Sequence, residues 1–179
     1  NSNQKTVAEF GCGLFYLADT LSTNFKKVHA SDFSYGMTKK AKERSRHLSN
    51  VVIKQEDIRT LKHKNKFDVV ISVNSLLMPS FSDLKKSFKN IHDSLKKNGI
   101  CFMILPSMEA VLYHGSLILH KQLDKHDEAT AKRIAKMKFE HKKYDFFTGI
   151  YTELGLQQKF YYKHGIKQFL KNAGFKDFE

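Results

Sequence analysis

The chain has 179 residues, about the size of one domain, and its hydrophobic fraction of 41% is enough for a buried core. Its polar first residues, and the lack of any apolar run near ~20 residues, lead us to expect neither a signal peptide nor a membrane span. The net charge of +13 comes mostly from lysines spread along the chain, which favours solvated faces over a nucleic-acid surface, although RNA or an acidic substrate stays open.

Up to residue 107, short apolar runs alternate with helical patterns, which is typical of α/β layering around a parallel sheet. Residues 82–97 show the clearest helical pattern, with apolar side chains on one face at Leu84, Phe88, Ile91 and Leu95. The sequence predicts strands at residues 6–10, 27–33, 51–57, 67–74 and 100–105, and helices at residues 15–21, 37–47 and 82–97, the last ended by Asn98-Gly99.

After residue 107 the pattern changes. Two helices, or one bent helix, are predicted at residues 109–125 and 127–143. Residues 144–162 are rich in aromatic and β-branched side chains and predict a hairpin with a turn near Glu153. A helix at residues 164–173 and a strand that begins within residues 175–178 are predicted to follow.

The two cysteines, Cys12 and Cys101, fall inside predicted core elements. Neither their number nor their spacing indicates a disulfide framework or a zinc site, so we expect reduced thiols in a cytoplasmic protein. The histidines show no metal-ligand spacing, and no metal is predicted.

The stretch around the first predicted strand carries the strongest functional signal. Strand 6–10 contains Glu9 and runs into Gly11 and Gly13, which a helix-compatible segment follows. Glycine takes positive φ and lets a ligand approach the backbone, and a strand–loop–helix corner points N–H groups into one crevice. This arrangement suits a nucleotide-like ligand at the carboxyl end of a parallel strand.

Val7-Ala-Glu-Phe-Gly-Cys-Gly resembles the first motif of class I methyltransferases that use S-adenosylmethionine (SAM), with Phe15 in place of the third glycine of that motif. Asp32-Phe-Ser-Tyr-Gly-Met resembles the family's second strand end, where an acid holds the SAM ribose and the next residue packs on adenine. Gln55-Glu-Asp-Ile-Arg resembles the third, where an Asp accepts from the adenine amino group and the next residue lends its N–H. Leu95-Lys-Lys-Asn-Gly-Ile and Ile166 to Phe175 resemble later turns of the family.

The resemblance implies a Rossmann-like three-layer α/β/α sandwich with a mostly parallel sheet, in one domain over residues 1–179. Residues 1–107 would be the SAM-binding core, residues 108–163 a lid and substrate insertion after the fifth strand, and residues 164–179 a late helix and strand. Both ends of the family fold are expected to be truncated here. The implied cofactor residues are Glu9, Gly11, Cys12, Gly13, Asp32, Phe33, Met37, Asp57, Ile58, Asn74 and Ser75.

The implied activity is methyl transfer from SAM to an acceptor, leaving S-adenosylhomocysteine. Asn74-Ser-Leu-Leu-Met-Pro lacks the Asn/Asp-Pro-Pro pattern of base methyltransferases and looks like the small-molecule branch. RNA or protein methylation, or SAM binding without activity, remain alternatives. No catalytic residue is assigned: His114, His120 or Tyr16 could be a base. The candidate pocket walls are Tyr151, Phe160, Tyr161 and Tyr162.

Overall fold

The computed structural model describes residues 2–178 of the chain. It contains two compact units, which we describe separately. Among the described residues, the core unit comprises 2–76, 80–105 and 169–178, and the helix–hairpin unit comprises 77–79 and 106–168.

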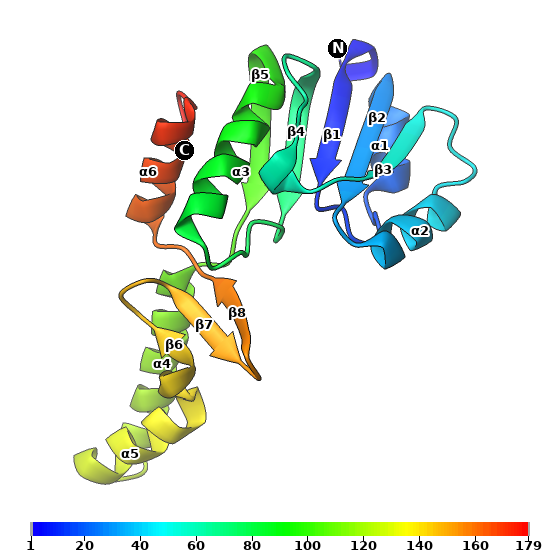
Figure 1. Cartoon of the computed structure of the whole chain (residues 1–179). Helices are drawn as coiled ribbons and strands as arrows, with labels where there is room; N and C mark the ends of the chain where they lie inside the picture. Colours follow the sequence, from blue (N-terminus) through cyan, green and yellow to red (C-terminus); the bar gives the residue numbers. More distant parts are fainter. Residues whose placement is uncertain (1, 179) are drawn as a thin grey trace. The chain divides into compact units, whose positions relative to one another are not determined.

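A five-stranded parallel sheet forms the centre of the core unit (Figure 1). Its strand order is β3-β2-β1-β4-β5, so the chain first builds outward from β1 and then crosses to the other side of β1. The strands are β1 (Thr6–Phe10), β2 (Lys27–Asp32), β3 (Val51–Gln55), β4 (Phe67–Val73) and β5 (Leu95–Ile104). The parallel sheet and its flanking helices confirm the predicted Rossmann-like fold class.

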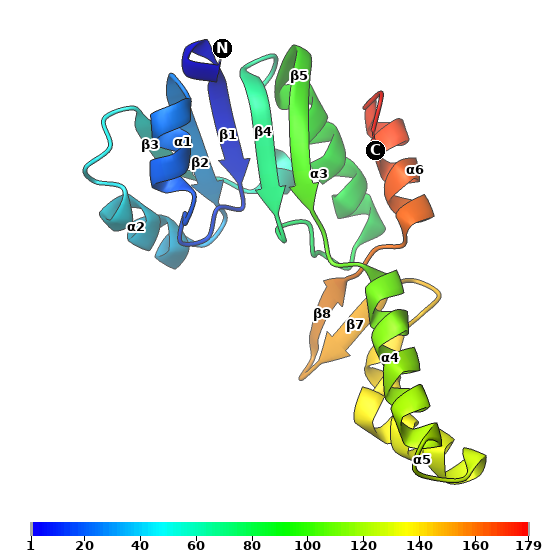
Figure 2. The ribbon, with the colours of Figure 1, turned by 180° about the vertical axis from the view of Figure 1, so that it is seen from behind.

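Helices cover both faces of this sheet. Figures 1 and 2 view it from opposite sides and place α1 on one face and α3 on the other. On the α1 face, Val7, Val28 and Ala30 pack with the helix residues Ala18, Leu21 and Ala41. The core-unit helices are η1 (Ser2–Gln4), α1 (Ala18–Asn24), α2 (Tyr35–Arg44), η2 (Ile58–Thr60) and α3 (Phe81–Ser94), joined by the end of α6 (Lys163–Ala173).

Local chemistry explains where the core helices begin. The hydroxyls of Ser34 and Ser80 accept the backbone N–H of the third residue of α2 and α3, respectively, which satisfies an otherwise unpaired donor. Leu84, Phe88 and Ile91 are fully buried on α3, which confirms the apolar face predicted for that helix.

The helix–hairpin unit contains α4 (Met108–Leu123) and α5 (Glu128–Phe139), which pack against each other, and a small antiparallel sheet. Gly115 of α4 lies so close to the Phe139 ring that a Cβ atom would stand 3.1 Å from it. After η3 (His141–Lys143), the sheet has the order β6-β7-β8, with β6 (Tyr144–Asp145), β7 (Ile150–Glu153) and β8 (Leu156–Lys159).

Several predicted boundaries are wrong. The chain turns before α1, so this helix begins at Ala18 rather than at residue 15. Helix α3 ends at Ser94, because Leu95 is extended and already pairs with Phe67. Strand β3 ends at Gln55, and α2 runs over residues 35–44 rather than 37–47. Two helices form after residue 107, each shorter than predicted.

The strand predicted within residues 175–178 is absent from the described part of the chain. Phe175 instead packs its ring edge-on against His92 at 5.1 Å between centroids. Nothing in the core unit tests the prediction that residues 108–163 form a lid, and it stays a prediction.

Candidate functional site

The site predicted from the sequence lies along the carboxyl edge of the core sheet. Glu9 is in β1, Asp32 ends β2, and Asn74 directly follows β4. These strands are parallel, so their ends meet at one edge, and the order reverses between β1 and β4. A crevice outside such a reversal point is where open α/β sheets bind their ligands.

The glycine loop after β1 folds back on the end of β2. The N–H groups of Gly11 and Cys12 both donate to the carbonyl oxygen of Ser31, at 2.7 and 2.9 Å. The N–H of Gly13 donates to the Asp32 carboxylate at 2.9 Å, and a Cβ atom at Gly13 would meet nothing within 4 Å. The loop therefore presents an open face directly beside Asp32.

Gly11 is fixed by its neighbour across the sheet. Its φ is +74°, and a Cβ atom there would come within 2.1 Å of the Cβ of Ser75. The Ser75 hydroxyl donates to the carbonyl oxygen of Phe10 at 3.1 Å and lies 2.6 Å from the Ser72 hydroxyl. Ser75 thus joins the ends of β1 and β4, where the strand order reverses.

Phe15 stands where the resembling motif has its third glycine. Its φ is +55° and its side chain is completely buried among the α1-side core residues. The loop therefore keeps the left-handed backbone that glycine favours, although the residue is aromatic.

Glu9 is a buried acidic residue at this edge of the sheet. It is only 5% exposed, and its Oε2 atom is buried without a hydrogen-bond partner. Burial raises the pKa of Glu9 to about 7. A buried carboxylate oxygen without a partner favours a ligand group that donates a hydrogen bond or carries a positive charge.

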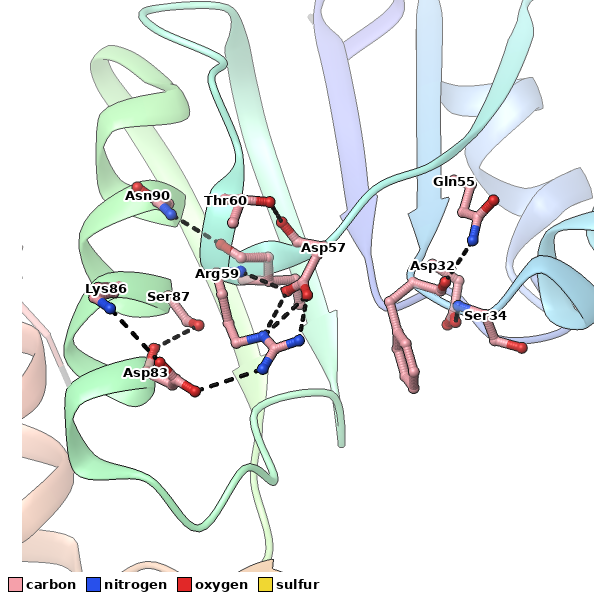
Figure 3. A network of polar contacts seen from close by, with 12 residues as sticks. Asp32, Ser34, Gln55, Asp57, Arg59, Thr60, Asp83, Lys86, Ser87 and Asn90 are labelled. Atoms are coloured by element: carbon pink, nitrogen blue, oxygen red, sulfur yellow. Dashed lines mark hydrogen bonds and ion pairs between the residues drawn. The ribbon is translucent and has the colours of Figure 1, made fainter.

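Asp32 is held by backbone donors on both of its oxygens. Besides Gly13 on Oδ2, the N–H of Ser34 donates to Oδ1 at 2.9 Å. Each carboxylate oxygen keeps a free lone pair, so two further hydroxyl donors can still be accepted. Farther along the same segment, the side chains of Phe33 and Met37 are 72% and 41% exposed. The Gln55 side chain, labelled in Figure 3, donates to the carbonyl oxygen of Phe33 at 2.9 Å.

Asp57, which the family resemblance implies to be an acceptor for the adenine amino group, is already paired with an arginine. Figure 3 shows Arg59 lying between Asp57 and Asp83 of α3. The Arg59 guanidinium lies 2.6 Å from Asp57 and 3.5 Å from Asp83, and the hydrogen bonds from Arg59 to Asp57 lower the pKa of Asp57. The carboxylate of Asp57 is thus already paired, whereas the neighbouring Ile58 is buried and its carbonyl oxygen accepts from Asn90.

The remaining predicted residues are Cys12 and Asn74. The Cys12 thiol is buried, and burial together with the charges of Glu9 and Asp32 raises its pKa to about 12. Both acids therefore lie close to this loop residue, and the thiol stays protonated at neutral pH. Asn74 is exposed at φ +48°, and its N–H donates to the carbonyl oxygen of Ile104 at 2.9 Å.

Two features of the site were missed from the sequence. The first is the ion pair between Arg59 and Asp57, which the sequence does indicate, because the two residues stand two positions apart directly after a strand. The second, the Gly11–Ser75 contact, had no local signal, because it joins residues that follow two different strands and lie far apart in the sequence.

The helix–hairpin unit contains its own pocket, of about 460 Å³. Aromatic side chains of α5 and the hairpin wall it, and Phe139 stacks on Tyr144 at 5.5 Å between centroids. Of the predicted wall residues Phe160 lines this pocket, and of the candidate bases His114 does. Tyr16, in the core unit, instead receives the Arg44 guanidinium over its ring at 4.8 Å.

Comparison with known proteins identifies the family. A family model described as a methyltransferase domain matches residues 7–99, just over half of the chain. A malonyl-[acyl-carrier protein] O-methyltransferase of Bacillus anthracis is 35% identical over 96 residues, which are 52% of this chain and 35% of that protein. The chain thus spans about a third of the length of the curated relatives that it matches.

Solved structures share the fold. A protein from Bacillus halodurans C-125, assigned as a methyltransferase, is similar over 99% of this chain and 65% of its own, with a TM-score of 0.66 and 16% identity. An amino pentose methyltransferase from Micromonospora echinaspora, solved with SAM bound, is similar over 59% of this chain and 44% of its own, with a TM-score of 0.54 and 19% identity. Within residues 2–178, no helix combines the length and apolar character needed to cross a membrane. The chain belongs to the methyltransferase domain family, in its class I SAM-dependent branch.

Proposed function

We propose that the core unit binds SAM and that the chain transfers the SAM methyl group to a small-molecule acceptor. The observation that carries this proposal is Glu9, whose buried Oε2 atom has no partner beside the open glycine loop. SAM carries an α-ammonium group and a sulfonium, and either positive charge would compensate a carboxylate at this depth.

The adenosine half of SAM fits the neighbouring strand ends. Asp32 has lone pairs left for both ribose hydroxyls, and the exposed ring of Phe33 offers a face on which adenine would stack. Asp57 and Ile58 would contact the adenine edge, but there an adenine amino group must share Asp57 with Arg59. Gly11, Cys12, Gly13 and Met37 would complete the cradle.

SAM, when bound, supplies a methyl group already activated by the sulfonium, so the protein need only position the acceptor. Holding two reactants in line contributes up to ~7–11 kcal/mol in favourable cases. Asn74 and Ser75, where β4 ends beside the glycine loop, are the residues that we propose to lie next to the reacting group.

The pocket of the helix–hairpin unit supports a small acceptor. It combines aromatic walls with His114, Lys138 and Glu140, which could recognise a polar group on a compact molecule. We infer that this unit contributes the acceptor specificity. The named substrate of the Bacillus relatives, malonyl-[acyl-carrier protein], is a second candidate acceptor.

Calorimetric titration with SAM tests the cofactor site. Asp32→Ala removes the ribose acceptor and is expected to weaken SAM binding roughly tenfold or more. Asp19→Ala is the matched control, because Asp19 is an exposed carboxylate of α1 whose partner is His47. Comparable, weak binding by wild type and Asp32→Ala would remove the SAM-site assignment.

Methyl transfer is tested separately with SAM labelled on its methyl group. The protein is incubated in parallel with a small-metabolite extract, with malonyl-[acyl-carrier protein] and with bulk RNA. Label in a small product supports the proposal. Label in the carrier protein or in RNA would show that the acceptor is a macromolecule of that class and not a small molecule. SAM binding without transfer to any fraction would indicate a binding module without activity.

A further inference from the structure

A second cluster of polar side chains lies away from the glycine loop, where three elements meet. His29 is in β2, Glu56 follows β3, and His63 lies in the segment between η2 and β4. Within residues 2–178, the ligand-type atoms of these three side chains all lie within 4.8 Å of one another. Their spacing in the sequence gives no metal motif, because the three residues come from three separate segments of the core unit.

The fold positions both rings before any ligand arrives. His29 alternates with Val28 and Ala30, which face the α1-side core, so its ring points to the opposite face of the sheet. There the His63 ring stacks on Phe10 with an interplanar angle of 7°, and it meets the His29 ring edge-on at 4.9 Å. Aromatic neighbours therefore restrict both imidazoles.

Both rings present the same nitrogen to the same carboxylate. His29 Nε2 lies 2.7 Å from Glu56 Oε2, and His63 Nε2 lies 3.1 and 3.2 Å from the two oxygens of Glu56. A tetrahedral zinc ion with bonds of about 2.0–2.1 Å holds its ligand atoms roughly 3.3 Å apart. The nitrogen–oxygen separations of 2.7 and 3.1 Å are about 0.6 and 0.2 Å shorter than this, and the two imidazole nitrogens lie within 4.8 Å of each other, so small side-chain movements would bring all three groups to a metal.

We propose that His29, Glu56 and His63 bind a divalent transition metal of the zinc type. Two imidazoles with one carboxylate favour such a metal over calcium or magnesium, which prefer oxygen ligands. The hydrogen that each Nε2 shares with Glu56 would move to Nδ1, so that both Nε2 lone pairs face the metal. The side chains are 7%, 20% and 14% exposed, so a water molecule can reach the fourth position.

The site would be coupled to the sheet edge described above. The N–H of Glu56 donates to the carbonyl oxygen of Asp32 at 3.1 Å, and Asp57 follows Glu56 directly in the sequence. A metal bound to Glu56 would therefore also restrict the backbone at the ends of β2 and β3, where Asp32 and Asp57 lie. Because metal affinity is measured without SAM, the metal proposal can fail independently of the methyltransferase proposal.

Calorimetric titration of the untagged, metal-stripped chain with Zn²⁺ tests this inference. We expect one site per chain, weakened roughly tenfold or more by His63→Gln and by Glu56→Gln. His47→Gln is the matched control, because His47 pairs with the single carboxylate of Asp19 on the surface, and it should leave the affinity unchanged. Loss of affinity in all three variants equally, or in none, would refute the site.

Cobalt(II) substitution of the wild type provides a readout that does not depend on any variant folding. Visible absorption bands of tetrahedral cobalt, displaced stoichiometrically by Zn²⁺, are expected. A spectrum of hydrated, six-coordinate cobalt would show that the three side chains form only a hydrogen-bonded cluster.

Discussion

Glu9 should make the stability of the chain depend on pH in an unusual direction. The folded chain raises the pKa of Glu9 from 4.5 to about 7, so between these values the native state holds a proton that the unfolded state has lost. The free energy of unfolding should therefore fall as the pH rises through this window, by about 3 kcal/mol in total.

Glu9→Gln removes this titration, and urea unfolding at pH 5 and pH 8 measures the effect. At pH 8 the variant should be more stable than wild type by up to about 3 kcal/mol, whereas at pH 5, just above the unfolded pKa of 4.5, the difference should shrink to less than about 1 kcal/mol. Other groups titrate equally in both proteins and cancel in the difference. A difference that is the same at both pH values would contradict the burial of an ionised Glu9.

The ionisation of Glu9 should also control the affinity for SAM, which is expected to rise with pH, whereas the stability of the chain falls. A cationic ligand favours the ionised form of Glu9, so wild-type affinity should weaken as the pH is lowered from about 7.5 to 5.5 through the pKa of about 7. Glu9→Gln should bind more weakly at pH 7.5 and show a flatter profile. Parallel profiles for the two proteins would place the positive charge of SAM elsewhere.

At Phe15, whose φ is positive, we expect the glycine variant to be more stable than the alanine variant, the reverse of the usual order. Replacing a buried Phe by Ala or Gly removes the ring, at about 3–5 kcal/mol, but only glycine relieves the positive φ, which opposes other residues by about 1–2 kcal/mol. Phe15→Gly should therefore unfold at higher urea than Phe15→Ala. Phe67, equally buried but within β4, is the control, and there the alanine variant should be the more stable.

At the level of elements, one contact should hold the glycine loop against β4. Gly11→Ala forces a Cβ atom to within 2.1 Å of Ser75 at a φ of +74°, and we expect a loss of about 2–4 kcal/mol. Ser75→Gly removes the opposing Cβ atom and should restore part of the loss in the double variant. Gly36→Ala, in α2 with its nearest atom 3.8 Å away, should be neutral or slightly stabilising.

The elements that the sequence predicted best are those set by local pattern. Strand β1 matches its predicted bounds because the segment Thr6–Phe10 ends directly at Gly11, and the buried face of α3 follows from the spacing of its apolar residues. Helix ends were less predictable, because pairing of Leu95 with β4 overrides the helical pattern up to Lys97. The packing of Phe175 on His92 likewise needs coordinates, since neither residue marks the other in the sequence.

The candidate site divides in the same way. The strand order brings Glu9 and Asp32 to one edge, where motif spacing along the chain had predicted a cofactor site. The pairing of Asp57 with Arg59 changes what that carboxylate can offer, and the His29–Glu56–His63 cluster was not predicted. Both depend on distances between elements, which the spacing of residues along the chain does not contain.

At the scale of the whole molecule, the uncovered face of β5 should control self-association. Strand β5 is the last in the order of the core sheet, and its alternate residues Ile100, Phe102 and Ile104 are 50–60% exposed. A row of exposed apolar side chains on an outer strand is a site where copies of a chain associate. Ile100→Thr, Phe102→Lys and Ile104→Thr together should therefore reduce concentration-dependent association in sedimentation velocity.

The matched control for that triple variant is Phe147→Lys in the helix–hairpin unit. Phe147 is 96% exposed, more than any residue of the β5 row, but it is one side chain rather than a continuous row on a strand. If exposed apolar area alone drives association, Phe147→Lys should reduce it as well. If the row on β5 drives it, only the triple variant should, and a wild type that stays monomeric at every concentration would exclude both explanations.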